Sequence, residues 1–248
     1  MASTFVNNLR LEEMNTGEQS GQWGTKTNTN LELVGEALGF GTEAITTNAN
    51  THATTVADAS SDAGRAIYII YTGTLDSACT ITIGPDTLKR VHIIKNGTSG
   101  SQNILIKQGA GAGAAVTIPP GDTKVVSLDG AGSGAIVTDV YASLSVVDLK
   151  VQDDLSLTSD SAVVSFGVDA DTTLTHTDGS GLTLNSTNKL MFNDASQFIQ
   201  GASATVLDIA ATDTIELTAT NIAVVGTMGA TGKITADAGI DIDNFNID

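Results

Sequence analysis

The histidines and aspartates are the residues of this 248-residue chain that could form a chemical site. His52, His92 and His176 are its three histidines, and none has a cysteine or carboxylate at the spacing of a known metal motif. His176 is the one weak metal candidate, because strand alternation places it on the same face as Leu174. In a trimer it could form a ring of three imidazoles on the axis. A hydrogen-bonded or outward-facing histidine is the simpler interpretation.

The acidic residues and glycines do not complete a binding or catalytic motif. Asp169, Asp171 and Asp178 resemble fragments of a calcium loop but lack its full spacing and terminal glutamate, as do the aspartates of residues 237–243. Turn formation explains them better. The glycine-rich segment 109–113 leads into a strand, so a phosphate-binding loop is not expected. Because no carboxylate pair or Ser–His–Asp arrangement has a motif context, we expect neither catalysis nor a cofactor.

Charge and composition exclude several classes of partner. The formal net charge is −17 with 11 basic residues, which are scattered, so binding to nucleic acid or to anionic membranes is not expected. The single cysteine, Cys79, allows no disulfide within the chain and lies in an apolar strand pattern. The first residues contain no basic segment followed by a long apolar run, and no stretch is long enough for a membrane span. These features predict a soluble protein made in the cytoplasm.

A short helix is predicted within an N-terminal arm, residues 1–45. Its apolar stripe is Leu31, Val34, Ala37 and Leu38, and Asn28, Thr29 or Asn30 could cap it. Gly39 is placed to end it. Trp23, the only tryptophan, stands before the helix and close to glycines. It either fills a pocket on a partner or covers the helix of its own chain.

The middle of the chain contains the only segment dense enough in apolar residues to fold as a globule. Residues 46–64 have few large apolar side chains and are predicted to be a linker or a weak strand. Residues 65–142 contain seven short apolar runs separated by turn formers, which predicts a small antiparallel β-sandwich or barrel. The expected core residues are Tyr68, Ile70, Ile81, Ile83, Val91, Ile93, Ile104, Ile106, Val116, Ile118, Val126 and Leu128.

Residues 143–248 show short apolar pairs that alternate with polar residues, about every eight to ten residues, as in very short strands with tight turns. The pairs are Leu149 and Val151, Leu155 and Leu157, Val164 and Phe166, Leu174 and His176, Leu182 and Leu184, Leu190 and Phe192, Leu207 and Ile209, Ile215 and Leu217, Ile222 and Val224, and Ile240 and Ile242. Strands with two inward side chains bury too little to stand alone. We therefore expect an all-β chain whose shaft of short repeats winds with two other copies round a threefold axis.

Three segments resemble tail fibre proteins of marine, largely cyanobacterial, tailed phages. They are GEQSGQWGTKTNTNLELVGEALGF at residues 17–40, the strand-rich segment from RAIYIIYTG to GAGSGA at residues 65–135, and LTHTDGSGLTLNSTNKLMFNDASQFIQGA at residues 174–202. The resemblance implies a structural protein of the virion tail, anchored by its N-terminus to a tail adaptor or nozzle protein. Its distal end would continue into another fibre segment or meet a host receptor during adsorption. The candidate attachment residues are Trp23, Leu31, Val34, Leu38 and Phe40.

Other functions remain as alternatives. A capsid-attached fibre differs only in where the N-terminus docks. A receptor-binding or glycan-binding adhesin needs an exposed aromatic and polar cluster, and a glycan depolymerase needs paired carboxylates in a groove. Because Ile240, Ile242, Phe245 and Ile247 continue the alternation to Asp248, we also expect the natural fibre to extend beyond this chain.

Overall fold

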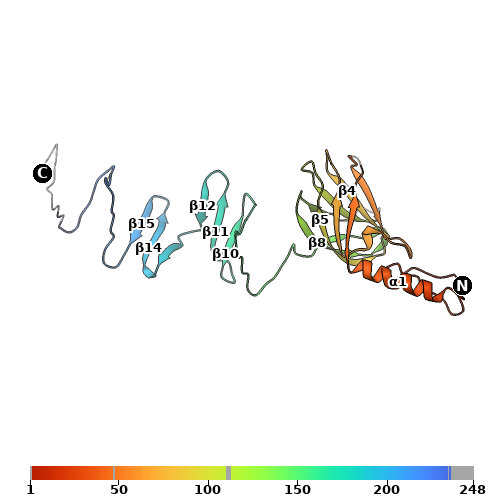
Figure 1. Cartoon of the computed structure of the whole chain (residues 1–248). Helices are drawn as coiled ribbons and strands as arrows, with labels where there is room; N and C mark the ends of the chain where they lie inside the picture. Colours follow the sequence, from red (N-terminus) through yellow and green to blue (C-terminus); the bar gives the residue numbers. More distant parts are fainter. Residues whose placement is uncertain (1, 47, 110–112, 234, 236–248) are drawn as a thin grey trace. The chain divides into compact units, whose positions relative to one another are not determined.

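The computed structural model describes residues 2–46, 48–109, 113–233 and 235. The chain forms two compact units, Met1–Leu149 and Lys150–Asp248, which are described separately (Figure 1). Most of the regular structure is β, as the sequence predicts. Among the described residues, no helix is long and apolar enough to cross a membrane.

The described residues of the N-terminal unit form one α-helix, two short 3-10 helices (η) and nine strands. In chain order they are α1 (Trp23–Ala37), β1 (Phe40–Ala44), β2 (Thr51–Thr55), η1 (Ala63–Arg65), β3 (Tyr68–Thr72), β4 (Cys79–Gly84), β5 (Lys89–Asn96), β6 (Ile104–Gln108), β7 (Val116–Ile118), β8 (Thr123–Asp129), η2 (Gly132–Gly134) and β9 (Val137–Asp139). Strands β3 to β9 coincide with the seven apolar runs of the sequence. Strands β1 and β2 precede them, so the sheets begin at Phe40 and include part of the predicted linker 46–64.

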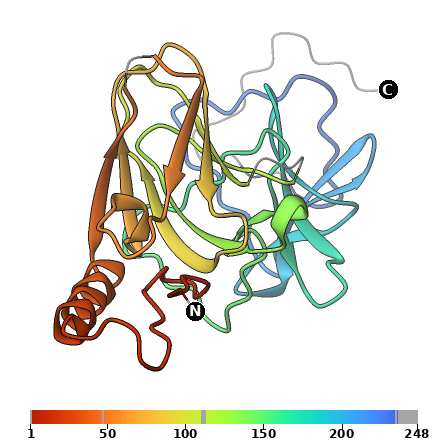
Figure 2. The same cartoon turned by 90° about the vertical axis from the view of Figure 1, so that its right-hand side faces the viewer.

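The strands form two sheets that face each other across one core (Figure 2). The first sheet has the order β1-β3-β5-β8-β9 and the second the order β2-β4-β6-β7. Successive strands from β1 to β6 alternate between the sheets, and neighbours among them pair in parallel. Only the pairs β5–β8, β6–β7 and β8–β9 are antiparallel.

The prediction of a sandwich is therefore correct, whereas an antiparallel sandwich or a barrel is wrong. The turns between the first six strands carry the chain across to the opposite sheet instead of back along the same one. After each circuit through both sheets, the chain therefore adds a strand beside the previous strand of the same sheet. The two neighbouring strands run in the same direction. The described strands do not close into a barrel, since each sheet has two edge strands.

The core lies between the two sheets and is almost entirely aliphatic. Its buried residues are Ile45, Ala66, Ile69, Tyr71, Leu75, Cys79, Ile81, Ile83, Ile94, Ile104, Ile106, Val116, Ile118, Val126, Leu128 and Val137. Four expected core residues, Tyr68, Ile70, Val91 and Ile93, instead lie on the outer face of the first sheet. Strands β3 and β5 are apolar on both faces, so alternation alone cannot choose the inward face, and a shift of one residue exchanges the faces.

The helix α1 starts earlier than its sequence suggests. It begins at Trp23 after Gln22, which makes no side-chain capping bond, whereas the sequence predicts a cap at residues 28–30. Asn30 cannot cap the helix because its side chain accepts from the Glu12 backbone N–H at 3.0 Å and donates to the Glu12 carbonyl at 2.9 Å. The end is as predicted, with the Gly39 N–H donating to the Glu36 carbonyl at 3.0 Å.

Residues before α1 are bonded to the sandwich and do not form a free arm. The side-chain oxygen of Asn8 accepts from the Lys89 N–H at 2.9 Å, at the start of β5. Arg10 lies 2.7 Å from Asp58 in an ion pair, and the Ala59 N–H donates to the Arg10 carbonyl at 2.9 Å. The predicted attachment arm is thus partly a structural element of the sandwich.

The described part of the C-terminal unit contains two antiparallel three-stranded sheets, each a simple meander. The first comprises β10 (Val163–Phe166), β11 (Thr172–Thr177) and β12 (Gly181–Leu184), and the second comprises β13 (Lys189–Phe192), β14 (Asp194–Ser203) and β15 (Val206–Ala210). None of the residues described from Lys150 onward is buried.

The strand pattern of this unit was only partly predictable. Five of the expected apolar pairs lie in β10, β11, β12, β13 and β15, while β14 was not expected. Four pairs fall in described segments without strand structure: Leu149 and Val151, Leu155 and Leu157, Ile215 and Leu217, and Ile222 and Val224. The pair Ile240 and Ile242 and the aspartates of residues 237–243 lie outside the described residues.

Candidate interaction surfaces

One face of α1 binds the N-terminal residues of its own chain. Leu33 and Ala37 are buried there, with 4% of each residue exposed. Lys26 lies one helical turn before Asn30 on this face, and its Nζ is 2.9 Å from the nearly buried Glu12 carboxylate. The hydrogen bond from Lys26 is the largest influence on Glu12 and lowers its pKa, against the opposing effect of burial. This face of the helix therefore already has its partner.

The adjacent face of α1 is apolar and uncovered. Trp23, Leu31 and Leu38 have 61%, 64% and 75% of their surface exposed, and Val34 is half-buried between them. Leu31, Val34 and Leu38 are three and four residues apart, which aligns them along one side of a helix. Four of the five candidate attachment residues thus form one stripe, and Trp23 is the first residue of the helix.

Phe40, the fifth candidate, begins a second apolar surface on the outer face of the first sheet. Its ring stacks on that of Tyr68 with 5.9 Å between centroids, and 62% of its surface is exposed. The strand register aligns Phe40, Tyr68, Ile93 and Val125 in one row across β1, β3, β5 and β8. The sequence analysis missed this row because it assigned the same residues of β3 and β5 to the core.

Arg65 is the centre of a buried polar network in the sandwich. Arg65 is fully buried and donates hydrogen bonds to the carbonyls of Leu9, Ala57 and Ser60, the last two at 2.6 and 2.8 Å. Its guanidinium also lies 3.1 Å from Asp62 and 3.4 Å from Glu36. Burial raises the pKa of Asp62 in this environment. Arg65 thereby joins the N-terminal segment, α1 and the loop after β2.

Two residues of the sandwich whose side chains could take part in chemistry, His52 and Cys79, have structural roles. His52 Nε2 lies 2.7 Å from Glu43 Oε1 and connects the edge strands β2 and β1. Cys79 is a buried free cysteine, and burial raises the pKa of its thiol, which makes it unreactive. No group of three or more histidine, cysteine, aspartate or glutamate side chains in the described part of the chain could hold a metal ion.

His92 is buried in the sandwich, on the inner face of β5. Its Nδ1 lies 2.9 Å from the carbonyl of Ala66. Burial, assisted by the positive charge of Arg90, lowers the pKa of His92 to about 4. Because an unfolded histidine titrates near pH 6.5, the folded protein binds the proton less well than the unfolded chain.

The contribution of His92 to the stability of the sandwich should therefore be complete above about pH 6.5 and should fall by about 3 kcal/mol as the pH drops towards about 4. We expect His92→Gln to flatten this part of the profile, because glutamine does not titrate. Chemical denaturation at a series of pH values measures the free energy of unfolding, with His52→Gln as the control variant. A variant profile that parallels that of the wild type would contradict this assignment.

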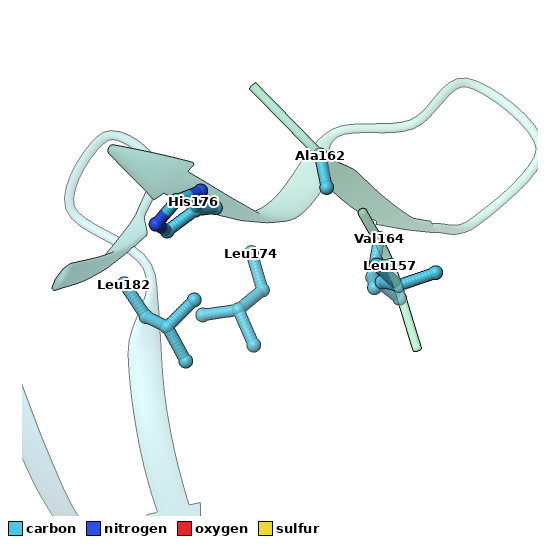
Figure 3. A pocket seen from close by; sticks show the side chains of 6 residues that line it. All are labelled: Leu157, Ala162, Val164, Leu174, His176 and Leu182. Atoms are coloured by element: carbon cyan, nitrogen blue, oxygen red, sulfur yellow. The ribbon is translucent and has the colours of Figure 1, made fainter. Parts of the chain in front are cut away.

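A hollow in the C-terminal unit lies on one face of the first meander (Figure 3). It has a volume of about 320 Å³ and is lined by Leu157, Ala162, Val164, Leu174, His176 and Leu182. His176 pairs with Leu182 in the register of β11 and β12, and its backbone N–H donates to the Ala162 carbonyl at 2.8 Å. The predicted placement of His176 on the face of Leu174 is confirmed.

No protein family matches this chain, and no curated protein or solved structure was found to be similar to it.

Proposed function

We propose that this chain is a structural fibre protein of a phage tail and that it acts as a homotrimer without catalytic activity. The observation that carries the proposal is the C-terminal unit, whose apolar side chains lie uncovered on two successive meanders. Phe166, Leu190 and Ile209 have 52%, 56% and 54% of their surface exposed in a single chain. Exposed apolar surface of this extent favours association, and an elongated shaft of several copies would cover it.

The assignment to phage tails rests on the resemblance of the three sequence segments to tail fibre proteins. In this proposal the sandwich lies at the virion end, and the shaft leads towards the host or towards a further fibre segment. The protein would be made in the host cytoplasm and carried in the virion. A capsid-attached fibre, a receptor-binding or glycan-binding adhesin and a glycan depolymerase remain the alternatives.

The uncovered stripe of α1 is the surface that we propose for attachment to a tail adaptor or nozzle protein, together with Phe40. Two properties support this choice. The stripe of Trp23, Leu31, Val34 and Leu38 carries no charged side chain, and it lies next to a helix face that its own chain already covers. A large exposed tryptophan is also a frequent anchor in protein interfaces.

Antibody labelling of assembled phage particles tests the proposal. We expect an antibody against the sandwich to label the tail, and Leu31→Asp to remove most of the label while leaving the isolated protein folded, because Leu31 is exposed. Thr25→Asp adds the same charge on another side of α1 and serves as the control. Label on the capsid would favour the capsid-fibre alternative. If particles incorporate the Leu31→Asp variant as well as the wild type, the stripe on α1 is not the attachment surface.

A further inference from the structure

The two faces of the first meander differ sharply in chemistry. Val164, Leu174 and Leu184 are in register, one from each strand, and His176 and Leu182 form the neighbouring row on the same side. The opposite face contains Val163, Ser165, Thr173, Thr175 and Thr183, most of which carry hydroxyl groups. We call these the apolar face and the threonine face. Only for the apolar face does removal from water lower the free energy.

The second meander repeats the apolar row of the first. Leu190, Ile199 and Ile209 are aligned across β13, β14 and β15. A partner that covers both meanders must itself present apolar rows that recur along its length. A second copy of this chain meets that requirement without any further assumption, because it carries the same rows at the same spacing.

Charge also favours copies of the chain as partners at this face. The chain has a net charge of −17, so copies that approach through acidic surfaces repel one another. The strands β10, β11 and β12 contain no aspartate, glutamate, lysine or arginine, and Asp171 and Asp178 lie in the turns that flank β11. The apolar face is thus a surface at which acidic copies can meet without burying a carboxylate.

His176 is the one polar side chain that lines the hollow of this face. Its imidazole has no hydrogen-bond partner among the described residues, and its neighbours there are Ala162, Leu174 and Leu182. When symmetric copies pack through this face, their His176 side chains stand at the same level. A neutral imidazole can be buried at moderate cost, but charged imidazoles would have to be desolvated close to one another.

We propose that the apolar face of β10, β11 and β12 is the surface through which copies of this chain associate, and that protonation of His176 opposes the association. This inference rests on the proposed oligomeric fibre and specifies which surface holds it together. None of the six residues that line the hollow is acidic, and the acidic residues nearest to them in sequence, Asp160 and Asp178, lie in turns outside the strands. We therefore expect assembly to weaken when His176 is protonated.

Cysteine cross-linking of the full chain tests which face is buried between copies. Leu174→Cys places a thiol on the apolar face, and Thr175→Cys, the next residue, places one on the threonine face. After mild oxidation we expect a covalent dimer band for Leu174→Cys and almost none for Thr175→Cys. The wild type controls for the buried thiol of Cys79. Cross-linking of Thr175→Cys but not of Leu174→Cys would overturn the inference.

Light scattering of the wild type and of His176→Gln tests the role of the histidine. At about pH 5 we expect the wild type to lose most of the oligomer that it forms at about pH 7.5, and His176→Gln to keep it. Both proteins retain His92, so acid effects on the sandwich are the same in each. Equal dissociation of the two proteins would overturn the role of His176. A wild type that is monomeric at both pH values would instead contradict the proposed fibre itself.

Discussion

Replacing Arg65 with alanine is expected to lower the free energy of unfolding of the sandwich by about 3–5 kcal/mol. The side chain is fully buried and donates to three backbone carbonyls in two separate segments, Leu9 in the N-terminal segment and Ala57 and Ser60 in the loop after β2. Its removal leaves these carbonyls without that donor and leaves the carboxylates of Asp62 and Glu36 without their cationic partner. Unpaired buried polar groups of this kind are among the costliest single changes in a folded protein.

Urea denaturation followed by circular dichroism measures this effect. Arg10→Ala is the matched control, because Arg10 pairs with Asp58, which is about half exposed, and such pairs contribute less than about 1 kcal/mol. The account requires a large difference between the two variants. Similar unfolding midpoints for Arg65→Ala and Arg10→Ala would show that the buried network does not hold the N-terminal segment to the sheets.

A charge placed on the apolar row of the second meander should prevent assembly. Ile199 is 39% exposed in the single chain and lies in register with Leu190 and Ile209. If copies bury this row, Ile199→Asp places a carboxylate from each copy in the interface. Because a buried unpaired carboxylate costs several kcal/mol, we expect association to weaken by at least about 100-fold.

Sedimentation over a range of protein concentrations measures that loss. Thr183→Asp introduces the same side chain on the threonine face of the first meander and should leave the oligomer intact. Unchanged assembly of Ile199→Asp, or equal disruption by the two variants, would show that the aligned rows do not form the contact between copies.

Much of the β-structure could be predicted because it depends on local alternation. The seven apolar runs from residue 65 onward are the strands β3 to β9, and Gly39 marks the end of α1. The parallel winding could not be predicted, since it depends on which sheet each turn leads to. Strand β2, with the sequence THATT, was predicted only as a linker or a weak strand because it has hardly any apolar side chain, yet its pairing with β4 makes it part of the second sheet.

The candidate interaction surfaces were predictable only where they depend on the periodicity of a single helix or strand. The stripe on α1 follows from helical spacing, and the side of His176 follows from strand alternation. The row from Phe40 to Val125 depends on the register between four strands that are distant in sequence. The start of α1 depends on the bonds between Asn30 and Glu12, which the sequence alone does not reveal.

The molar mass of the full chain in solution at neutral pH tests the central claim most directly. We expect three times the 25.3 kDa of one chain by light scattering, with no dissociation on dilution, because the apolar rows of both meanders are uncovered in a single copy. A uniform particle with the mass of one chain, with the C-terminal unit folded, would contradict it.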